Sequence, residues 1–187
     1  MGRLTLIAWV LVAAPATAVP PSVLVEETTH YFAGEKEAAR VFMGVGAMSL
    51  AAGTALAFQD DRVAYHSAWP MLGVGLVEAL AVVILEATTD AQVGRLLDQI
   101  GTDPEGFRQA ELTRMRRVDW EFTALLWLEG VLAAGGIAMA IAGEMEDIEP
   151  LAGVGYSLTA QSAVMFCFDM ILFDHAKAYT AGIGGQF

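Results

Sequence analysis

Four long apolar segments constrain the fold of this chain more than any other feature. They cover residues 41–58, 68–85, 122–142 and 151–173, and their charged side chains are Glu78, Glu129 and Asp169. A helix needs about 20 mostly apolar residues to cross a hydrocarbon core of roughly 30 Å. The segments therefore predict an all-α membrane protein with four transmembrane helices. A soluble bundle of four buried helices is the alternative, and it is disfavoured because uncharged runs this long are rare outside membranes.

A sequence repeat relates the first two segments to the last two. The stretch WPMLGVG at 69–75 returns as EPLAGVG at 149–155, and LAAG at 50–53 returns at 132–135. Each copy joins two apolar segments through a short acidic loop, so we expect an up-down bundle made of two tandem helical hairpins. Pro70 and Pro150 predict the starts of the second and fourth helices, because proline in a first turn loses no hydrogen bond. Parallel repeats occur in transporters, but duplication of a stable hairpin requires no such function.

Small residues in the first and third segments predict where helices pack closely. Gly44, Gly130 and Gly135 are among them, and the glycines of the two GVG signatures, at 73, 75, 153 and 155, are expected to allow the same close approach. Close backbone approach favours helix association in membranes, where lipid supplies no hydrophobic force. We therefore expect helix contacts at these glycines.

The connection 89–120 is polar and has helical periodicity. Val93, Leu96, Leu97 and Ile100 share one helical face, which predicts an amphipathic helix lying on the membrane surface. The sequence Asp103-Pro104-Glu105 then predicts a new helix, with aspartate as its cap and proline in its first position. We expect this second helix to continue into the third apolar segment.

The amino terminus supports two interpretations. Arg3, an apolar run over 4–14 and Ala16-Thr17-Ala18 are typical of a signal peptide covering residues 1–18. The alternative is an uncleaved extra span reaching to about residue 25, which the positive-inside rule favours because it places the arginines of 89–120 in the cytoplasm. In both cases we expect a multi-pass protein of the plasma (inner) membrane of a bacterium.

Four polar residues within the apolar segments form a candidate intramembrane cluster. They are Glu78, Glu129, Gln161 and Asp169. Helical rise places the three acids in the half of the membrane next to the connection 89–120. A charge near the bilayer centre costs at least about 2.5–3.5 kcal/mol, so each should face the bundle. One hypothesis is a proton- or cation-accepting site in which repelling carboxylates hold an exchangeable proton.

The structural alternative assigns these polar groups to helix packing. Gln161 and the buried acids would then hydrogen-bond between helices, at about 0.6 kcal/mol per contact. Acids nearer the boundary, including Glu86 and Asp169, would pair with Arg40, Arg114 or Arg117.

Composition and spacing exclude several classes of function. The net charge of −12, with ten Lys and Arg residues, disfavours nucleic-acid binding. The single cysteine, Cys167, cannot form an internal disulfide, and we expect a buried, inert thiol. His66 and His175 lie at opposite ends of the bundle, so we expect no metal site, no haem and no other cofactor. The serines lack a histidine at matching depth, so we expect no catalytic residues and no enzyme.

The aromatic residues near the segment ends predict the membrane interface. Trp69, Trp120, Trp127, Tyr65 and Tyr179 lie toward the ends of the apolar segments. Amphipathic rings of this kind are enriched at lipid headgroups. We therefore expect all five to be interface anchors.

For function we expect a non-enzymatic protein that acts in the lipid bilayer through protein partners. It would be a homo-oligomer or a subunit of a larger membrane assembly, because short loops leave little extramembrane mass. Arg114, Arg116 and Arg117 are the candidate contacts for acidic partners or anionic lipid head groups. The alternative is a small proton- or cation-linked transporter or channel that uses the intramembrane carboxylates.

Overall fold

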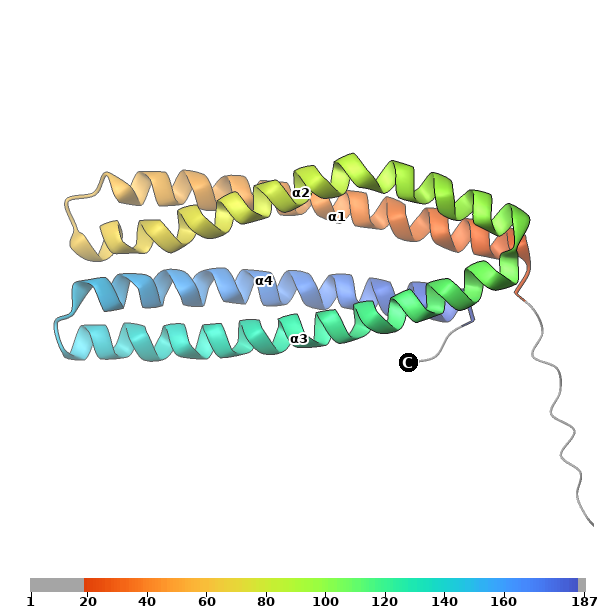
Figure 1. Ribbon diagram of the computed structural model, residues 1–187. Helices are drawn as coiled ribbons and strands as arrows, with labels where there is room; N and C mark the ends of the chain where they lie inside the picture. The colour runs from red at the N-terminus through yellow and green to blue at the C-terminus, as the bar shows by residue number, and fades with distance from the viewer. Residues whose placement is uncertain (1–18, 185–187) are drawn as a thin grey trace, which may run out of the picture.

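A computed structural model describes residues 19–184 of the chain, and they form an up-and-down array of long helices (Figure 1). The helices are α1 (Pro21–Ala57), α2 (Arg62–Thr102), α3 (Pro104–Met145) and α4 (Glu149–Gly182). Residues 19–184 contain no strand. All four helices are long and apolar enough to cross a membrane. The prediction of an all-α protein with four candidate membrane-spanning helices is therefore confirmed. The predicted signal peptide, residues 1–18, lies outside the described residues.

The helix starts follow local capping chemistry. The Asp103 carboxylate accepts a hydrogen bond from the Gly106 amide at 2.9 Å, and Pro104 occupies the first turn of α3, as predicted. Pro150 likewise lies in the first turn of α4. Pro70, however, lies inside α2, so the prediction that it starts a helix is wrong. The helix begins earlier because Asp61 accepts a hydrogen bond from the Ala64 amide at 2.8 Å and caps it there.

The bundle has two chemically different halves. Its helices contain 34 to 42 residues, which corresponds to roughly 50–60 Å at a rise of about 1.5 Å per residue. That is about twice the ~30 Å thickness of a hydrocarbon core. Residues 41–85 and 122–173, at the end with the two short loops, form what we call the apolar half. Residues 19–40, 86–121 and 174–184, at the other end, form the polar half.

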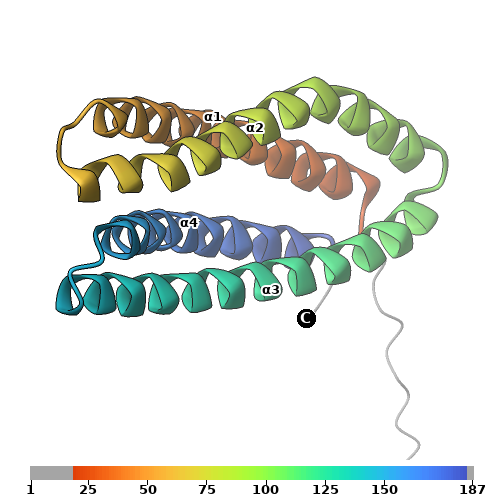
Figure 2. The same cartoon turned by 60° about the vertical axis from the view of Figure 1, so that its left-hand side comes forward.

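The connection 89–120 is helical but does not form a separate surface helix. Residues 89–102 continue α2, and residues 104–120 are the first part of α3, so both extend the bundle (Figure 2). Ile100 is buried in the core of the polar half, and Val93, Leu96 and Leu97 pack against that core. The predicted position on the membrane surface is therefore corrected. The apolar face exists as expected, but the protein itself covers it.

Glycines set the closest helix contacts within the apolar half. A β-carbon built on Gly75 of α2 would lie 2.9 Å from the Gly46 carbonyl oxygen of α1. In the same way, a β-carbon on Gly155 of α4 would lie 2.6 Å from the Gly136 carbonyl oxygen of α3. Such backbone proximity requires glycine. The helices therefore pack in two pairs, α1 with α2 and α3 with α4.

Of the glycines expected at helix contacts, Gly75, Gly153 and Gly155 lie at such contacts, so the prediction is confirmed for them. It is wrong for the other four, because a β-carbon added there would have no atom of a neighbouring helix within 4 Å; these are Gly44, Gly73, Gly130 and Gly135. Each successive residue turns by about 100° around a helix. Gly135 therefore faces outward although the adjacent Gly136 lies at the contact.

This difference gives a matched test of packing. Gly155→Ala should lower the free energy of unfolding by about 1–3 kcal/mol, because the added methyl group overlaps the α3 backbone. Gly135→Ala should be neutral or stabilising by up to about 1 kcal/mol, because alanine is the better helix former. Unfolding in mixed detergent micelles measures both. Equal effects of the two variants would contradict the described packing.

The two helix pairs are joined mainly through α4. Ser67 of α2 donates a hydrogen bond to the Gly153 carbonyl oxygen at 2.9 Å, and Ser157 of α4 donates to the Ser67 carbonyl oxygen at 2.6 Å. Farther along α4, Ser49 of α1 donates to the Gln161 side-chain oxygen at 3.3 Å. Small polar side chains thus hold the pairs together inside the apolar half.

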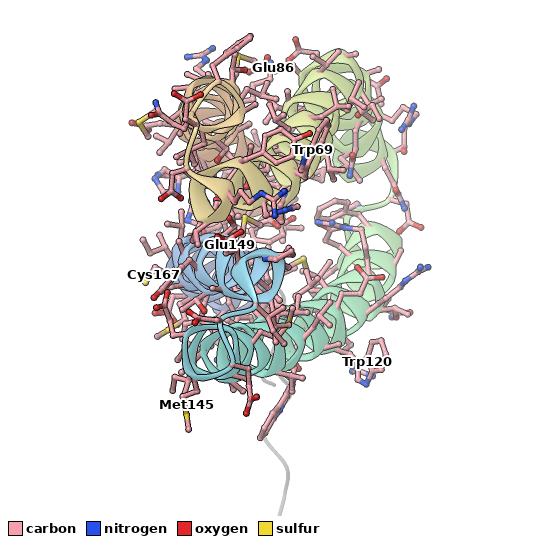
Figure 3. All side chains as sticks on the ribbon, turned by 90° about the vertical axis from the view of Figure 1, so that its left-hand side faces the viewer. Trp69, Glu86, Trp120, Met145, Glu149 and Cys167 are labelled. Carbon is pink, nitrogen blue, oxygen red and sulfur yellow. The ribbon has the colours of Figure 1, made fainter. Side chains whose placement is uncertain are left out.

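The outer surface carries aromatic rings and the thiol. Trp69, Trp120 and Trp127 are 56%, 70% and 74% exposed, in accordance with an outward-facing role. Cys167 is also exposed and points outward from α4 (Figure 3). The expectation of a buried thiol is therefore wrong. The helical face that carries Cys167 is opposite the buried Asp169 and faces away from the bundle.

Candidate functional site

Two of the predicted intramembrane acids lie side by side. Glu129 of α3 and Asp169 of α4 are each 6% exposed, and both line the same cavity between the helices. They meet because α3 and α4 pack along their length as an antiparallel pair. Neither forms a salt bridge with a basic side chain among residues 19–184. We call these two residues the carboxylate pair.

The carboxylate pair borders a cavity between the two helix pairs. This inner cavity has a volume of about 330 Å³ and is lined by all four helices. Most of its wall is apolar, with Phe42 and Phe168 stacked at a centroid distance of 4.8 Å. The Glu129 Oε2 atom is buried and has no hydrogen-bond partner among the described residues. The cavity thus combines an apolar wall with negative charge at one place.

The other two predicted cluster members lie apart from the pair. Glu78 faces Gly46 of α1, and both its carboxyl oxygens are buried without a hydrogen-bond partner among residues 19–184. It lines a neighbouring cavity of about 340 Å³, which shares Phe42, Ala81 and Met165 with the inner cavity. Gln161 bonds to Ser49 and does not line the inner cavity. The structure therefore brings together only Glu129 and Asp169 of the four.

A second polar cluster lies in the polar half, and the sequence did not indicate it. Glu111 is 3% exposed and accepts hydrogen bonds from Arg114 at 2.9 and 2.7 Å and from the Tyr179 hydroxyl at 2.9 Å. The Tyr179 hydroxyl also lies 3.2 Å from the Thr28 hydroxyl. Tyr179 is thus a core residue, and its prediction as an interface anchor is wrong. The three-residue spacing of Glu111 and Arg114 allows an ion pair within one helix, but this spacing does not indicate that the pair is buried.

The three candidate arginines differ in their surroundings. The Arg114 guanidinium lies 5.9 Å from the ring centre of Tyr31 and 5.7 Å from that of Phe32. Its charge is therefore engaged inside the bundle. Arg116 is exposed, and Arg117 is exposed and bonds to Glu121 at 2.7 Å. At the boundary between the halves, Arg40 lies 3.7 Å from Glu86, which is one of the expected pairs.

An outer cavity continues from the inner cavity into the polar half. It has a volume of about 420 Å³, and it is lined by Glu26, Glu27 and His30 together with Tyr31 and His175. Tyr31 and His175 also line the inner cavity, and their rings stack at 5.3 Å. These two rings therefore separate the two cavities.

Two further contacts define this division. The His175 Nε2 atom lies 3.2 Å from the Tyr31 carbonyl oxygen. A β-carbon on Gly34 would overlap the His175 ring, so glycine at this position lets the imidazole reach α1. Glu35 lies beside these rings on the inner side, outside the apolar segments, and burial raises the pKa of its carboxyl group. The outer end of the inner cavity is therefore lined by polar, titratable groups.

Residues 19–184 do not form a site for a metal ion held by side chains. Within the described residues, no three His, Cys, Asp or Glu side chains come close enough together to hold one. The chemistry available at the carboxylate pair is binding of a proton or of a positive charge.

No protein family, curated protein or solved structure matches this chain.

Proposed function

We propose that this chain is a small proton- or cation-linked membrane transporter or channel in which the carboxylate pair binds the transported charge. The observation that carries the proposal is the burial of Glu129 and Asp169 at the wall of a cavity, without a basic partner among residues 19–184. Acids inside the membrane are costly, and when they face the bundle interior or a cavity they are typical of ion and proton pathways. The sequence left this function as the alternative, and the cavity now favours it.

The arrangement of cavities supports a route to the pair from the polar half. The outer cavity carries Glu26 and Glu27, which attract cations, and it shares Tyr31 and His175 with the inner cavity. A shift of these two rings would connect the cavities. Between the carboxylate pair and the short loops, the Ser67–Gly153 and Ser157–Ser67 hydrogen bonds hold α2 against α4. These contacts would block a route to the pair from the short-loop end. Access from one side at a time is what a transporter requires.

Further parts of the proposal follow from the same arrangement. Gly75 and Gly155, which occupy the same position in the two copies of the repeat, each contact the backbone of the preceding helix, and this supports an origin by duplication of one helical hairpin. We place the protein in the plasma membrane of a bacterium as a multi-pass protein. A homo-oligomer would supply the lateral packing that four helices lack, and the exposed Arg116 is available to a partner or to lipid head groups.

Flux measurements test the proposal. In proteoliposomes with an imposed pH gradient, the wild-type protein should conduct protons or cations above the level of protein-free liposomes. Glu129→Gln should reduce this flux by about tenfold or more, because it removes one of the two carboxyl groups that bind the charge. Glu37→Gln changes an exposed acid on α1 and should leave the flux unchanged. Wild-type flux equal to that of empty liposomes would refute the proposal.

A further inference from the structure

We infer that the ligand of the inner cavity is a monovalent organic ammonium cation with an apolar body, held by Glu129 and Asp169. This inference rests on the proposed function, since it names the class of cation that the carboxylate pair would bind. It is carried by two separate properties of the cavity: a buried carboxyl oxygen with no hydrogen-bond partner among the described residues, and a largely apolar wall.

The carboxylate pair provides the charge recognition. Glu129 and Asp169 are both more than nine-tenths buried, and the unpartnered Glu129 Oε2 belongs to a side chain that lines the cavity. Burying a charge in an apolar environment is costly unless an opposite charge compensates it. A monovalent cation beside the pair would supply this compensation, and the second carboxyl group could remain protonated.

The cavity wall selects against a bare inorganic ion. Inorganic cations such as Ca²⁺ need about six to eight oxygen ligands, whereas side chains such as Phe42, Val82, Phe122 and Phe168 form most of this wall. Aromatic rings attract organic ammonium groups through their electron-rich faces, and quaternary ammonium groups need no hydrogen-bond acceptors. The wall therefore suits a cation that carries its own apolar surface.

The volume limits the size of the cation. At about 330 Å³ the inner cavity is at the lower end of the roughly 300–1,000 Å³ typical of ligand sites. A small aromatic or branched alkyl ammonium ion fits this limit. Tyr31 and His175 line the outer end of the inner cavity, where it adjoins the outer cavity.

Titration calorimetry of the full chain in mild detergent, with benzyltrimethylammonium as the probe, tests this inference. Wild-type protein should bind the probe saturably, and it should not bind the neutral isostere in which carbon replaces nitrogen. Asp169→Asn should weaken binding by about tenfold or more, because it removes a buried charge partner. Ala38→Leu should have a similar effect by filling the cavity from α1 while keeping both carboxyl groups. Ala33→Leu, on the exposed face of the same helix, is its control.

The outcomes separate this inference from the proposed function. Proton flux through the wild-type protein without binding of benzyltrimethylammonium would overturn the inference and leave the proposed function standing. Equal binding of the neutral isostere, or unchanged affinity in Asp169→Asn and Ala38→Leu, would also overturn it. Absence of both flux and binding would refute the inference and the proposed function together.

Discussion

Replacing Glu111 with alanine should lower the free energy of unfolding by about 2–4 kcal/mol, because it removes a buried carboxylate that hydrogen-bonds a half-buried arginine. Glu111 is 3% exposed and receives hydrogen bonds from both Arg114 and Tyr179. Its loss would leave the Arg114 charge without its carboxylate among the rings of Tyr31 and Phe32. Unfolding in mixed detergent micelles, followed by circular dichroism, measures the change.

A matched control is available on the same helix. Glu121 forms an ion pair with Arg117 at 2.7 Å, but the two side chains are 49% and 81% exposed. Exposed pairs contribute about 0–1 kcal/mol, so Glu121→Ala should have little effect. A Glu111→Ala variant as stable as Glu121→Ala would contradict the buried cluster.

The second large effect is expected from changing both members of the carboxylate pair. Glu129→Gln combined with Asp169→Asn should abolish proton or cation flux, leaving only the background of protein-free liposomes. Each single variant keeps one carboxyl group that can still accept a charge, whereas the double variant keeps none. The free energy of unfolding should stay the same or rise, since acids near the bilayer centre cost about 2.5–3.5 kcal/mol each. Flux in proteoliposomes and unfolding in micelles measure the two effects.

Glu78 is a control for a buried acid that does not line the inner cavity. It is as buried as the pair, but it lines the neighbouring cavity and faces Gly46. Glu78→Gln should therefore retain flux. A loss of stability in the double variant with flux unaffected would assign the pair a structural role and contradict the proposal.

The helices were predictable to the extent that their signals are local. The Asp103-Pro104 start of α3 follows from capping chemistry alone, and it is confirmed. The start of α2 was predicted wrongly. Both Asp61 and Pro70 are acceptable start signals, and the helix begins at the cap that Asp61 forms. The contact at Gly136 was also missed, because a shift of one residue from Gly135 is a rotation of about 100° that the repeat does not specify.

The sequence predicted how far along each helix the acids of the candidate site lie, but only partly which way their side chains face. Counting residues along each segment placed Glu78, Glu129 and Asp169 in the same part of the bundle. It could not show which acids face one another, because that depends on how each helix is rotated. The polar cluster was missed for a different reason. Glu111 and Tyr179 lie in segments of polar composition, and only the packing of α1 and α4 against α3 buries them.

Infrared spectroscopy of the protein in lipid tests the central claim, that the buried side chains of Glu129 and Asp169 form a proton-accepting pair beside a cavity. Two adjacent carboxyl groups cannot both carry charge without strong repulsion, so one should hold a proton that exchanges with solvent. We predict a carboxylic-acid carbonyl band that changes as the pH is lowered, shifts in D₂O and disappears in the Glu129→Gln/Asp169→Asn variant. A spectrum without such a band, or a band that persists in the double variant, would contradict the claim.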